Sequence, residues 1–134
     1  TCLLMENYFQ EKHITLQKKY ETGVPEAPVD PTQIKQVFLN ILMNAVESMP
    51  DGGKLDVKIK SIDGSVKIYI VDAGKGMKQD VLQNIYDPFF TTKPSGTGVG
   101  LSVSLKIIED HGGTIDAISE QGKGTTMLLT LPIK

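Results

Sequence analysis

Residues 55–76 read LDVKIKSIDGSVKIYIVDAGKG, and this stretch decides the fold. Apolar and polar residues alternate on both sides of Asp63 and Gly64, which is the pattern of two strands joined by a tight turn. We therefore expect a β-hairpin. The alternation of the second strand continues to Asp72, so this carboxylate should face the core. Burying a carboxylate is costly unless it receives hydrogen bonds, and the neighbouring sequence offers no obvious donor.

Asp72 also opens the first of two glycine-rich elements. The first element, residues 72–76, follows the expected strand, and the second, GTGVGL at residues 96–101, precedes a helical pattern. Glycines at alternate positions let the main chain approach a ligand closely, and amides at the start of a helix attract phosphate. The second element has neither the lysine of a P-loop nor the surroundings of a Rossmann motif. Together the two elements predict a nucleotide pocket closed by a lid.

A long amphipathic helix should begin at Pro31. Asp30 followed by Pro31 and Gln33 fits a capping box with proline at the first helical position. Residues 50–53, PDGG, end the pattern. The apolar stripe of this helix consists of Ile34, Val37, Phe38, Ile41, Leu42, Ala45 and Met49.

The remaining segments complete the expected order of elements. They are a helix over 3–10, a strand over 13–20, a loop over 22–30, a short helix over 81–85, a lid over 86–97, a helix over 99–110, and strands over 114–119 and 125–131. This order favours an α+β fold in which helices cover one face of a mixed sheet, a two-layer α/β sandwich. The 134 residues fit one domain, 1–134.

Composition argues against several classes of partner. The net charge of −2 leaves no basic footprint, so nucleic acid is not expected as the main partner. No apolar run approaches the roughly twenty residues of a spanning helix, and we expect no direct membrane contact by this domain.

Cys2 is the single cysteine, which suits a reducing compartment such as the cytoplasm. The start at Thr1 favours a piece of a longer protein.

Three side chains are candidates for phosphate chemistry. Asn40 and Asn44 lie one helical turn apart on the flank of the apolar stripe. An asparagine oxygen can bind Mg²⁺, which takes other ligands from water and phosphates, although such a pair can also simply bond to neighbouring loops. Lys93 precedes the second glycine-rich element and either reaches a phosphate or is solvated. His13 and His111 have no partners at catalytic spacing and are interpreted as structural.

Four motifs in order resemble the catalytic, ATP-binding domain of bacterial sensor histidine kinases. Residues 37–45 resemble the N box, 72–76 the first glycine box, 87–93 the F box and 96–101 the second glycine box. The resemblance runs from about Asp30 to the end of the chain. It places the chain in the GHKL superfamily with gyrase, the heat-shock chaperone ATPases and the mismatch-repair ATPases. The end of the F box is most similar to the sporulation and nitrogen-regulation kinases.

The resemblance implies a Bergerat-type fold that binds ATP and Mg²⁺ and transfers the γ-phosphoryl group to a histidine. It implies catalytic roles for Asn40, Asn44 and Lys93, with Asn44 as the metal ligand. Asn40 stands where hydrolysing relatives carry a glutamate base, so ATP hydrolysis should be slow. The ATP-binding residues carried over by position are Asn44, Asp72, Gly74, Gly76, Thr97, Gly98, Val99, Gly100 and Leu101.

The implied partners are other parts of a signalling system. No phosphoacceptor motif occurs in the chain, so the accepting histidine is expected on a separate dimerisation domain, with a response regulator downstream. Residues 1–10 would be the end of a helix leading from that domain, and the parent protein would be soluble or anchored in the cell membrane. Two alternatives stay open. One is an anti-sigma-factor serine kinase, which would form acid-stable phosphoserine, and the other is a nucleotide-binding regulatory module without transfer.

Overall fold

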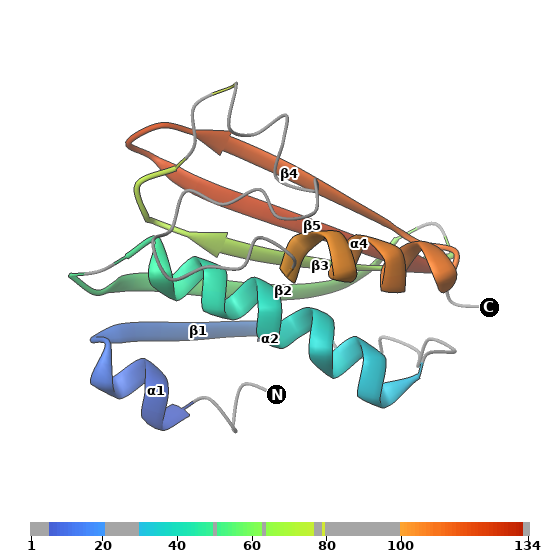
Figure 1. Cartoon of the computed structure of the whole chain (residues 1–134), viewed down its shortest axis with the longest axis horizontal. Helices are drawn as coiled ribbons and strands as arrows, with labels where there is room; N and C mark the ends of the chain where they lie inside the picture. The colour runs from blue at the N-terminus through green and yellow to red at the C-terminus, as the bar shows by residue number, and fades with distance from the viewer. Residues whose placement is uncertain are drawn as a thin grey trace.

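Five strands form one mixed sheet in the order β1-β2-β3-β5-β4 (Figure 1). The computed structural model describes residues 6–20, 30–49, 51–62, 64–76, 79 and 100–132. β1 pairs with β2 in parallel, and every other neighbouring pair is antiparallel. The strands are β1 (Ile14–Tyr20), β2 (Gly53–Ile62), β3 (Ser65–Asp72), β4 (Thr114–Glu120) and β5 (Gly124–Pro132).

Two helices lie side by side over one face of this sheet, α2 (Pro31–Glu47) and α4 (Gly100–Asp110) (Figure 1). The short helix α1 (Glu6–Glu11) packs against β1 through Phe9, which is buried. The described residues therefore form the two-layer α+β sandwich that the sequence predicts. Within them, no helix is both long and apolar enough to cross a membrane.

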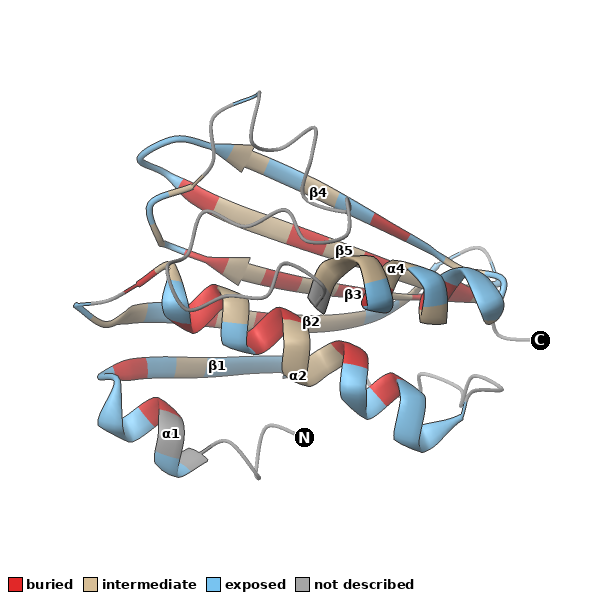
Figure 2. Cartoon of the chain, in the orientation of Figure 1, coloured by how far each residue is buried: buried red, intermediate tan, exposed pale blue. Residues whose placement is uncertain are grey.

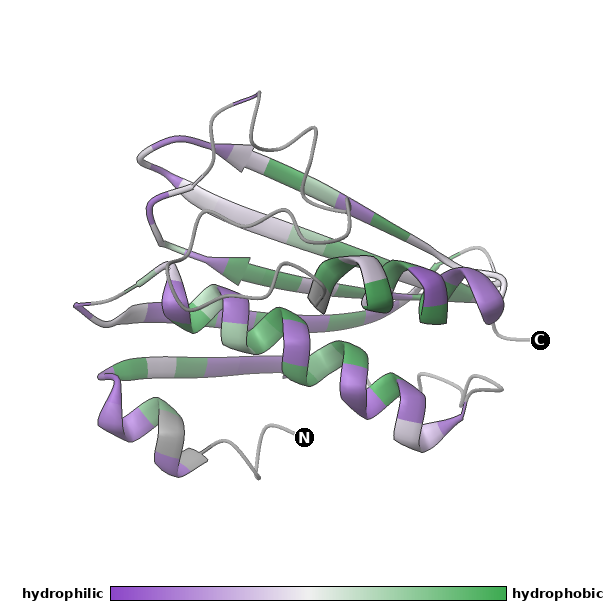
Figure 3. Ribbon diagram, viewed as in Figure 1, coloured by the Kyte–Doolittle hydropathy of each residue, from purple (hydrophilic) through white to green (hydrophobic). Residues whose placement is uncertain are grey.

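The expected hairpin is present as β2 and β3. Ile62 pairs with Ser65, and Gly64 adopts a φ of 79° in the tight turn between the strands. Alternate residues of β3 are buried, ending with Asp72, as the alternation predicts (Figures 2 and 3). The buried side of β2 and β3 faces α2 and α4, so the carboxylate of Asp72 lies on the helix-covered face.

The core lies between the sheet and the helices. Six of the seven predicted stripe residues of α2 are buried, while Phe38 is half-buried against the core. The largest fully buried side chains are Ile41, Leu42, Leu55, Ile70, Ile108, Leu129 and Val37.

The sequence places most boundaries within one or two residues. The strands predicted at 13–20, 114–119 and 125–131 are observed as β1, β4 and β5. The expected helix over 81–85, the lid over 86–97 and residues 1–5 lie outside the described residues, as does the loop over 22–30 except for Asp30. The origin of residues 1–10 in a dimerisation helix stays a prediction.

The capping box at the start of α2 is only half correct. Asp30 is the N-cap, and its carboxylate accepts hydrogen bonds from the amides of Thr32 (2.9 Å) and Gln33 (3.2 Å). In a capping box the amide of Asp30 would donate to the side chain of Gln33. Here the Asp30 amide donates instead to Nε2 of His111 at 3.0 Å. A residue 81 positions away thus completes the cap.

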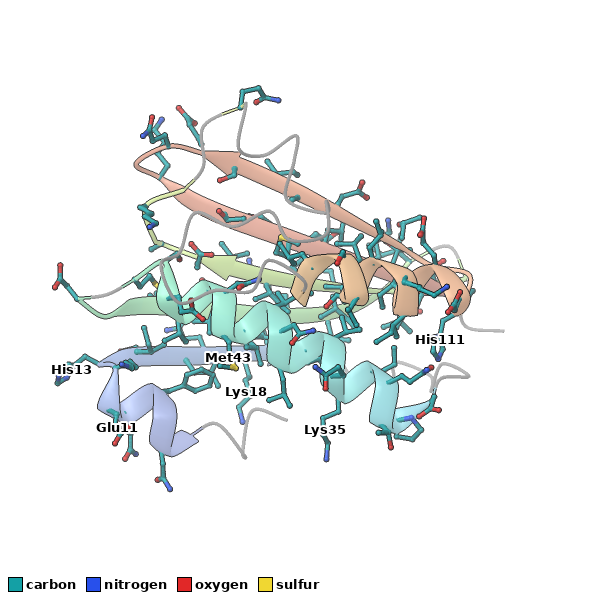
Figure 4. All side chains as sticks on the ribbon, in the orientation of Figure 1. Glu11, His13, Lys18, Lys35, Met43 and His111 are labelled. Carbon is teal, nitrogen blue, oxygen red and sulfur yellow. The ribbon has the colours of Figure 1, made fainter. Side chains whose placement is uncertain are left out.

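His111 joins the end of α4 to the start of α2 (Figure 4). Its Nδ1 lies 2.8 Å from the carbonyl oxygen of Ile107, one helical turn earlier. Since Nε2 accepts from the Asp30 amide and Nδ1 faces a carbonyl, the neutral ring with its hydrogen on Nδ1 satisfies both contacts. The interpretation of His111 as a structural residue is confirmed.

Removing the His111 ring should therefore destabilise the fold. We expect His111→Ala to lower the free energy of unfolding by about 1–2 kcal/mol, because two hydrogen bonds are lost. Urea unfolding followed by circular dichroism measures this loss. Lys106→Ala, on the exposed side of the same helix, serves as control and should change stability by less than about 0.5 kcal/mol. Equal stability of the two variants would show that the connection to Asp30 contributes nothing.

Candidate nucleotide site

A polar ridge runs along α2 beside its buried stripe. Asn40, Asn44 and Ser48 follow one another at intervals of four residues, and all three are half-buried. From Asn40 to Ser48 the ridge covers about 12 Å of helix axis at 1.5 Å per residue. Because one helix carries all three side chains, their spacing is rigid. We call these three residues the polar ridge.

The middle of α2 is hydrogen-bonded to α4 at Asn40. Asn40 Nδ2 donates to Oγ of Ser104 at 3.2 Å, and Asn40 Oδ1 accepts from Nε2 of Gln36 at 3.2 Å. Ser104 is fully buried, and it lies one helical turn after Gly100, the first residue of α4. A buried hydroxyl that receives a hydrogen bond in this way fixes the amide plane of Asn40.

The carboxylate of Asp72 is held at the other end of the ridge. Its side chain is buried, and Oδ1 accepts hydrogen bonds from the amides of Gly74 (2.9 Å) and Thr125 (3.2 Å). Thr125 is the residue that faces Asp72 across β3 and β5. The expectation that the surroundings lack a donor was wrong, because the donors are main-chain amides of its own turn and of a neighbouring strand.

Ser48 brings α2 into contact with this carboxylate. Burial raises the pKa of Asp72 above its ordinary value, while hydrogen bonds from the amides of Gly74 and Thr125 and from the Ser48 hydroxyl act in the opposite direction. The Ser48 hydroxyl also lies 2.7 Å from the carbonyl oxygen of Ala45. Its single hydrogen can therefore point either back into the helix or toward Asp72.

The glycines after Asp72 are needed for close packing of the chain on itself. A Cβ at Gly74 would overlap the Ser48 side chain and lie 2.6 Å from its carbonyl oxygen, and one at Gly76, where φ is 66°, would overlap the carbonyl of Glu120. Backbone atoms of this protein fill the space at these two positions, although the main chain can still border a ligand.

Two main-chain hydrogen bonds fix the turn that contains these glycines. The Lys75 amide donates to the carbonyl of Ser48 at 3.2 Å, and the Gly122 amide donates to the carbonyl of Lys75 at 2.7 Å. The turn is thus fastened to the end of α2 on one side and to the β4–β5 connection on the other. It can serve as a rigid wall of a binding site.

The structure brings five of the predicted site residues to one region. Asn40 and Asn44 lie on α2, and Ser48 at its end contacts Asp72 and Gly74. Gly76 lies farther along the same turn and packs against Glu120.

Gly100 begins α4, and Leu101 is half-buried against the core. Lys93, Thr97, Gly98 and Val99 lie outside the described residues.

Sequence reasoning missed three contributors, Ser48, Ser104 and Thr125. Ser104 falls between Leu101 and Ile108 on the apolar side of its helix, and a serine at such a position signals a buried hydrogen bond. Ser48 continues the four-residue spacing of Asn40 and Asn44, which was a second available signal. The role of Thr125 depends on strand register and has no local signal.

The donor set fits one kind of metal site. Among the described residues, no group of three or more His, Cys, Asp or Glu side chains could enclose a metal ion. Asn44, half-buried on the polar ridge, offers a single amide oxygen. This arrangement suits Mg²⁺ that arrives with a nucleotide, because Mg²⁺ usually keeps several waters and takes further ligands from phosphates.

Comparison with known sequences identifies close relatives. Sporulation kinase E of Bacillus subtilis (strain 168) is 48% identical over 123 residues, which are 91% of this chain and 17% of that protein. Sensor histidine kinase ZraS of Escherichia coli (strain K12) is 41% identical over 122 residues, 91% of this chain and 26% of that protein. The chain therefore spans only about a sixth to a quarter of the length of these relatives.

Solved structures of similar fold are also histidine kinases. The nucleotide-free catalytic domain of ThkA matches with a TM-score of 0.87 and 31% identity, covering 98% of this chain and 86% of that one. Full-length ShkA in complex with AMPPNP matches with a TM-score of 0.87 and 27% identity, covering 97% of this chain and 28% of that one. ThkA in complex with the response regulator TrrA matches with a TM-score of 0.84 and 28% identity, covering 98% and 38%.

Residues 29–134 match the profile of one family over most of the chain. This match, the two-layer fold and the order of the four motifs agree. The chain belongs to the histidine kinase-, DNA gyrase B-, and HSP90-like ATPase family, and within it to the catalytic domains of sensor histidine kinases.

Proposed function

We propose that this chain binds ATP between the polar ridge, Asp72 and the start of α4, and that it transfers the γ-phosphoryl group to a histidine on a separate dimerisation domain. One observation carries the proposal. A buried carboxylate held by two amides lies at one end of the ridge, and an asparagine fixed by a buried serine of α4 lies toward the other. The adenine base and the phosphate chain of ATP need different chemical groups at the two ends of a binding site. The carboxylate would serve the base, and the asparagine would serve the phosphates.

Asp72 is the proposed adenine ligand. Its carboxylate would accept a hydrogen bond from the exocyclic amine, while the amides of Gly74 and Thr125 hold its Oδ1 in position. A hydrogen bond to a charged group in a desolvated position contributes more than one between neutral groups. The main chain of Gly74 and Gly76 would border the base.

Asn44 is the proposed ligand for Mg²⁺, with Asn40 beside it near the phosphates. The ion, when bound with ATP, neutralises charge on the phosphate oxygens. Asn40 cannot act as a general base, since an amide does not accept a proton at neutral pH, so water is not activated there. The site is suited to phosphoryl transfer by positioning and charge stabilisation, and Ser104 acts as a positioning residue for Asn40.

The lid residues enter the proposal through their motifs. Lys93 would contact a β- or γ-phosphate, and the amides of Thr97, Gly98, Val99 and Gly100 would close over the phosphates, with Leu101 at the start of the helix. The ShkA complex with AMPPNP supports ATP as the nucleotide, and the ThkA complex with TrrA supports a response regulator as a downstream partner. A cytoplasmic location is part of the same proposal and rests on the cysteine content.

Replacing Asp72 by asparagine should separate binding from folding. We expect Asp72→Asn to weaken ATP binding at least about tenfold, because the amide that replaces one carboxylate oxygen would face the adenine amine donor to donor. Titration calorimetry with ATP and with inosine triphosphate measures the effect. The native chain should prefer ATP, since inosine carries an oxygen in place of the amine, and the variant should lose most of this preference. Equal affinity of the native chain for both nucleotides would exclude Asp72 as the adenine ligand.

The same variant tests the burial of the carboxylate. The pKa of Asp72 is raised on folding, so its contribution to stability is present below its ordinary value of 3.8 and is lost as the pH rises through the raised value. Asp72→Asn stays neutral and should therefore be at least as stable as the native chain at neutral pH. The difference in free energy of unfolding should shrink as the pH falls toward 3.8. Urea unfolding at both pH values measures it, with the exposed Asp116→Asn as control. If Asp72→Asn lowered the free energy of unfolding by more than about 1 kcal/mol at neutral pH, the destabilising burial of the carboxylate would be contradicted.

Transfer should produce an acid-labile phosphate on histidine. Incubating the chain with ATP labelled in the γ-phosphate and a histidine-bearing dimerisation domain should label that domain, and the label should disappear in acid. Ser104→Ala should slow transfer about tenfold while ADP affinity changes less than twofold, because only the positioning of Asn40 is disturbed. Ser61→Ala, at a half-buried serine of β2, is the control. Acid-stable label would favour a serine kinase, and nucleotide binding without label would favour the regulatory module.

A further inference from the structure

The face of the sheet opposite the helices carries five lysines, Lys19, Lys54, Lys58, Lys60 and Lys67, which we call the lysine face. Strand register puts them on one side, since the alternate residues of β2 and β3 face α2 and α4. All residues of β2 and β3 on this side are half-buried or exposed, and none of the described helices packs on it. In Figure 1 this side points away from the viewer.

Charge is strongly concentrated there. Asp56 is the single acidic residue on this side of β1–β3, so five lysines against one aspartate give a formal charge of +4. The whole chain carries −2, and the remainder therefore carries −6. Adjacent strands lie about 4.8 Å apart and residues rise about 3.3 Å each, so the lysine face measures roughly 10 by 20 Å. This is a flat patch large enough to form part of a protein interface.

The arrangement of the lysines costs stability. Lys19 lies directly opposite Lys58 across β1 and β2, and Lys60 lies opposite Lys67 across β2 and β3. Like charges directly opposite one another destabilise a sheet. The Lys60 ammonium lies 5.9 Å from the centre of the Tyr69 ring, which offsets only part of this cost.

The lysines are not neutralised within the described part of the chain. Two salt bridges of that part involve Lys106 and Lys123, and none of the five lysines has a carboxylate within 4.0 Å there. Even Asp56, between Lys54 and Lys58 on the same strand, has its Oδ1 buried without a hydrogen-bond partner. Five lysines repel one another on this face, and Asp56 is the single carboxylate beside them among the described residues of β1–β3. The excess of positive charge indicates a counter-charge from another molecule.

We propose that the lysine face is a docking surface for a protein that presents a cluster of Asp and Glu side chains. Charge complementarity selects the sign of the partner, and two observations select its class. All fourteen Lys and Arg positions of the chain are lysines. The chain therefore has no arginine guanidinium, which binds phosphate groups through two parallel hydrogen bonds. The β4 side of the same sheet face carries exposed Asp116 and Ile118, which a uniformly anionic membrane or nucleic acid backbone would not favour. This proposal is independent of the nucleotide site.

A peptide of ten glutamates is a suitable probe for the lysine face. In NMR titration of the isotope-labelled full chain at low salt, its addition should shift backbone amides of β1–β3. The double variant Lys58→Gln with Lys60→Gln should bind the peptide at least about fivefold more weakly, and raised salt should weaken binding to the native chain. The same variant should melt at a higher temperature, because both like-charge pairs are broken, and should bind ATP as the native chain does.

The matched control is Lys35→Gln with Lys106→Gln, which removes two charges from the helical side of the molecule. It should change peptide affinity by less than about twofold. Equal weakening by both double variants would show that net charge alone attracts the peptide, and the proposal would be wrong. Absence of binding would also overturn it, as would tighter binding of phosphatidylserine vesicles or duplex DNA to the lysine face. Lys67→Gln alone provides a milder variant and should weaken binding in the same direction.

Discussion

The proposed site is organised around the buried side chain of Asp72, which also connects three elements of the fold. It ends β3 and accepts hydrogen bonds from its own turn at Gly74 and from β5 at Thr125, and Ser48 brings in the end of α2. A carboxylate in this position is stable only where several donors converge on it. The strand, the neighbouring strand and the long helix are thereby fixed relative to one another at the point where the nucleotide base is proposed to bind.

Two hydrogen bonds join α2 and α4 at different positions along the helices. Near the middle of α2, Asn40 bonds to the buried Ser104, and at its start the Asp30 amide bonds to His111. Both partners belong to α4 or to its end, so the helix that follows the second glycine-rich element is held against α2 along its length. The proposed phosphate side of the site is therefore held by hydrogen bonds between the two helices.

Much of this could be predicted from the sequence, because the decisive signals are local. Alternation in residues 55–72 predicts the hairpin and the inward direction of Asp72, and Asp30 with Pro31 predicts the start of α2. The predictions that failed concerned hydrogen bonds with residues distant in the chain. The donor from Thr125 requires the β3–β5 register, and the cap completed by His111 spans 81 positions. Gly74 was expected at a close approach of the main chain, and the structure shows Ser48 of this chain closely packed against it.

The central claim is that Asp72, the polar ridge and the start of α4 together form an ATP site that takes up magnesium with the nucleotide. Calorimetric titration of the chain with ATP, in the presence and absence of Mg²⁺, tests it most directly. The account predicts saturable binding of one ATP per chain that becomes tighter when Mg²⁺ is present. Absence of binding in a sample shown to be folded by circular dichroism, or binding indifferent to Mg²⁺, would contradict it.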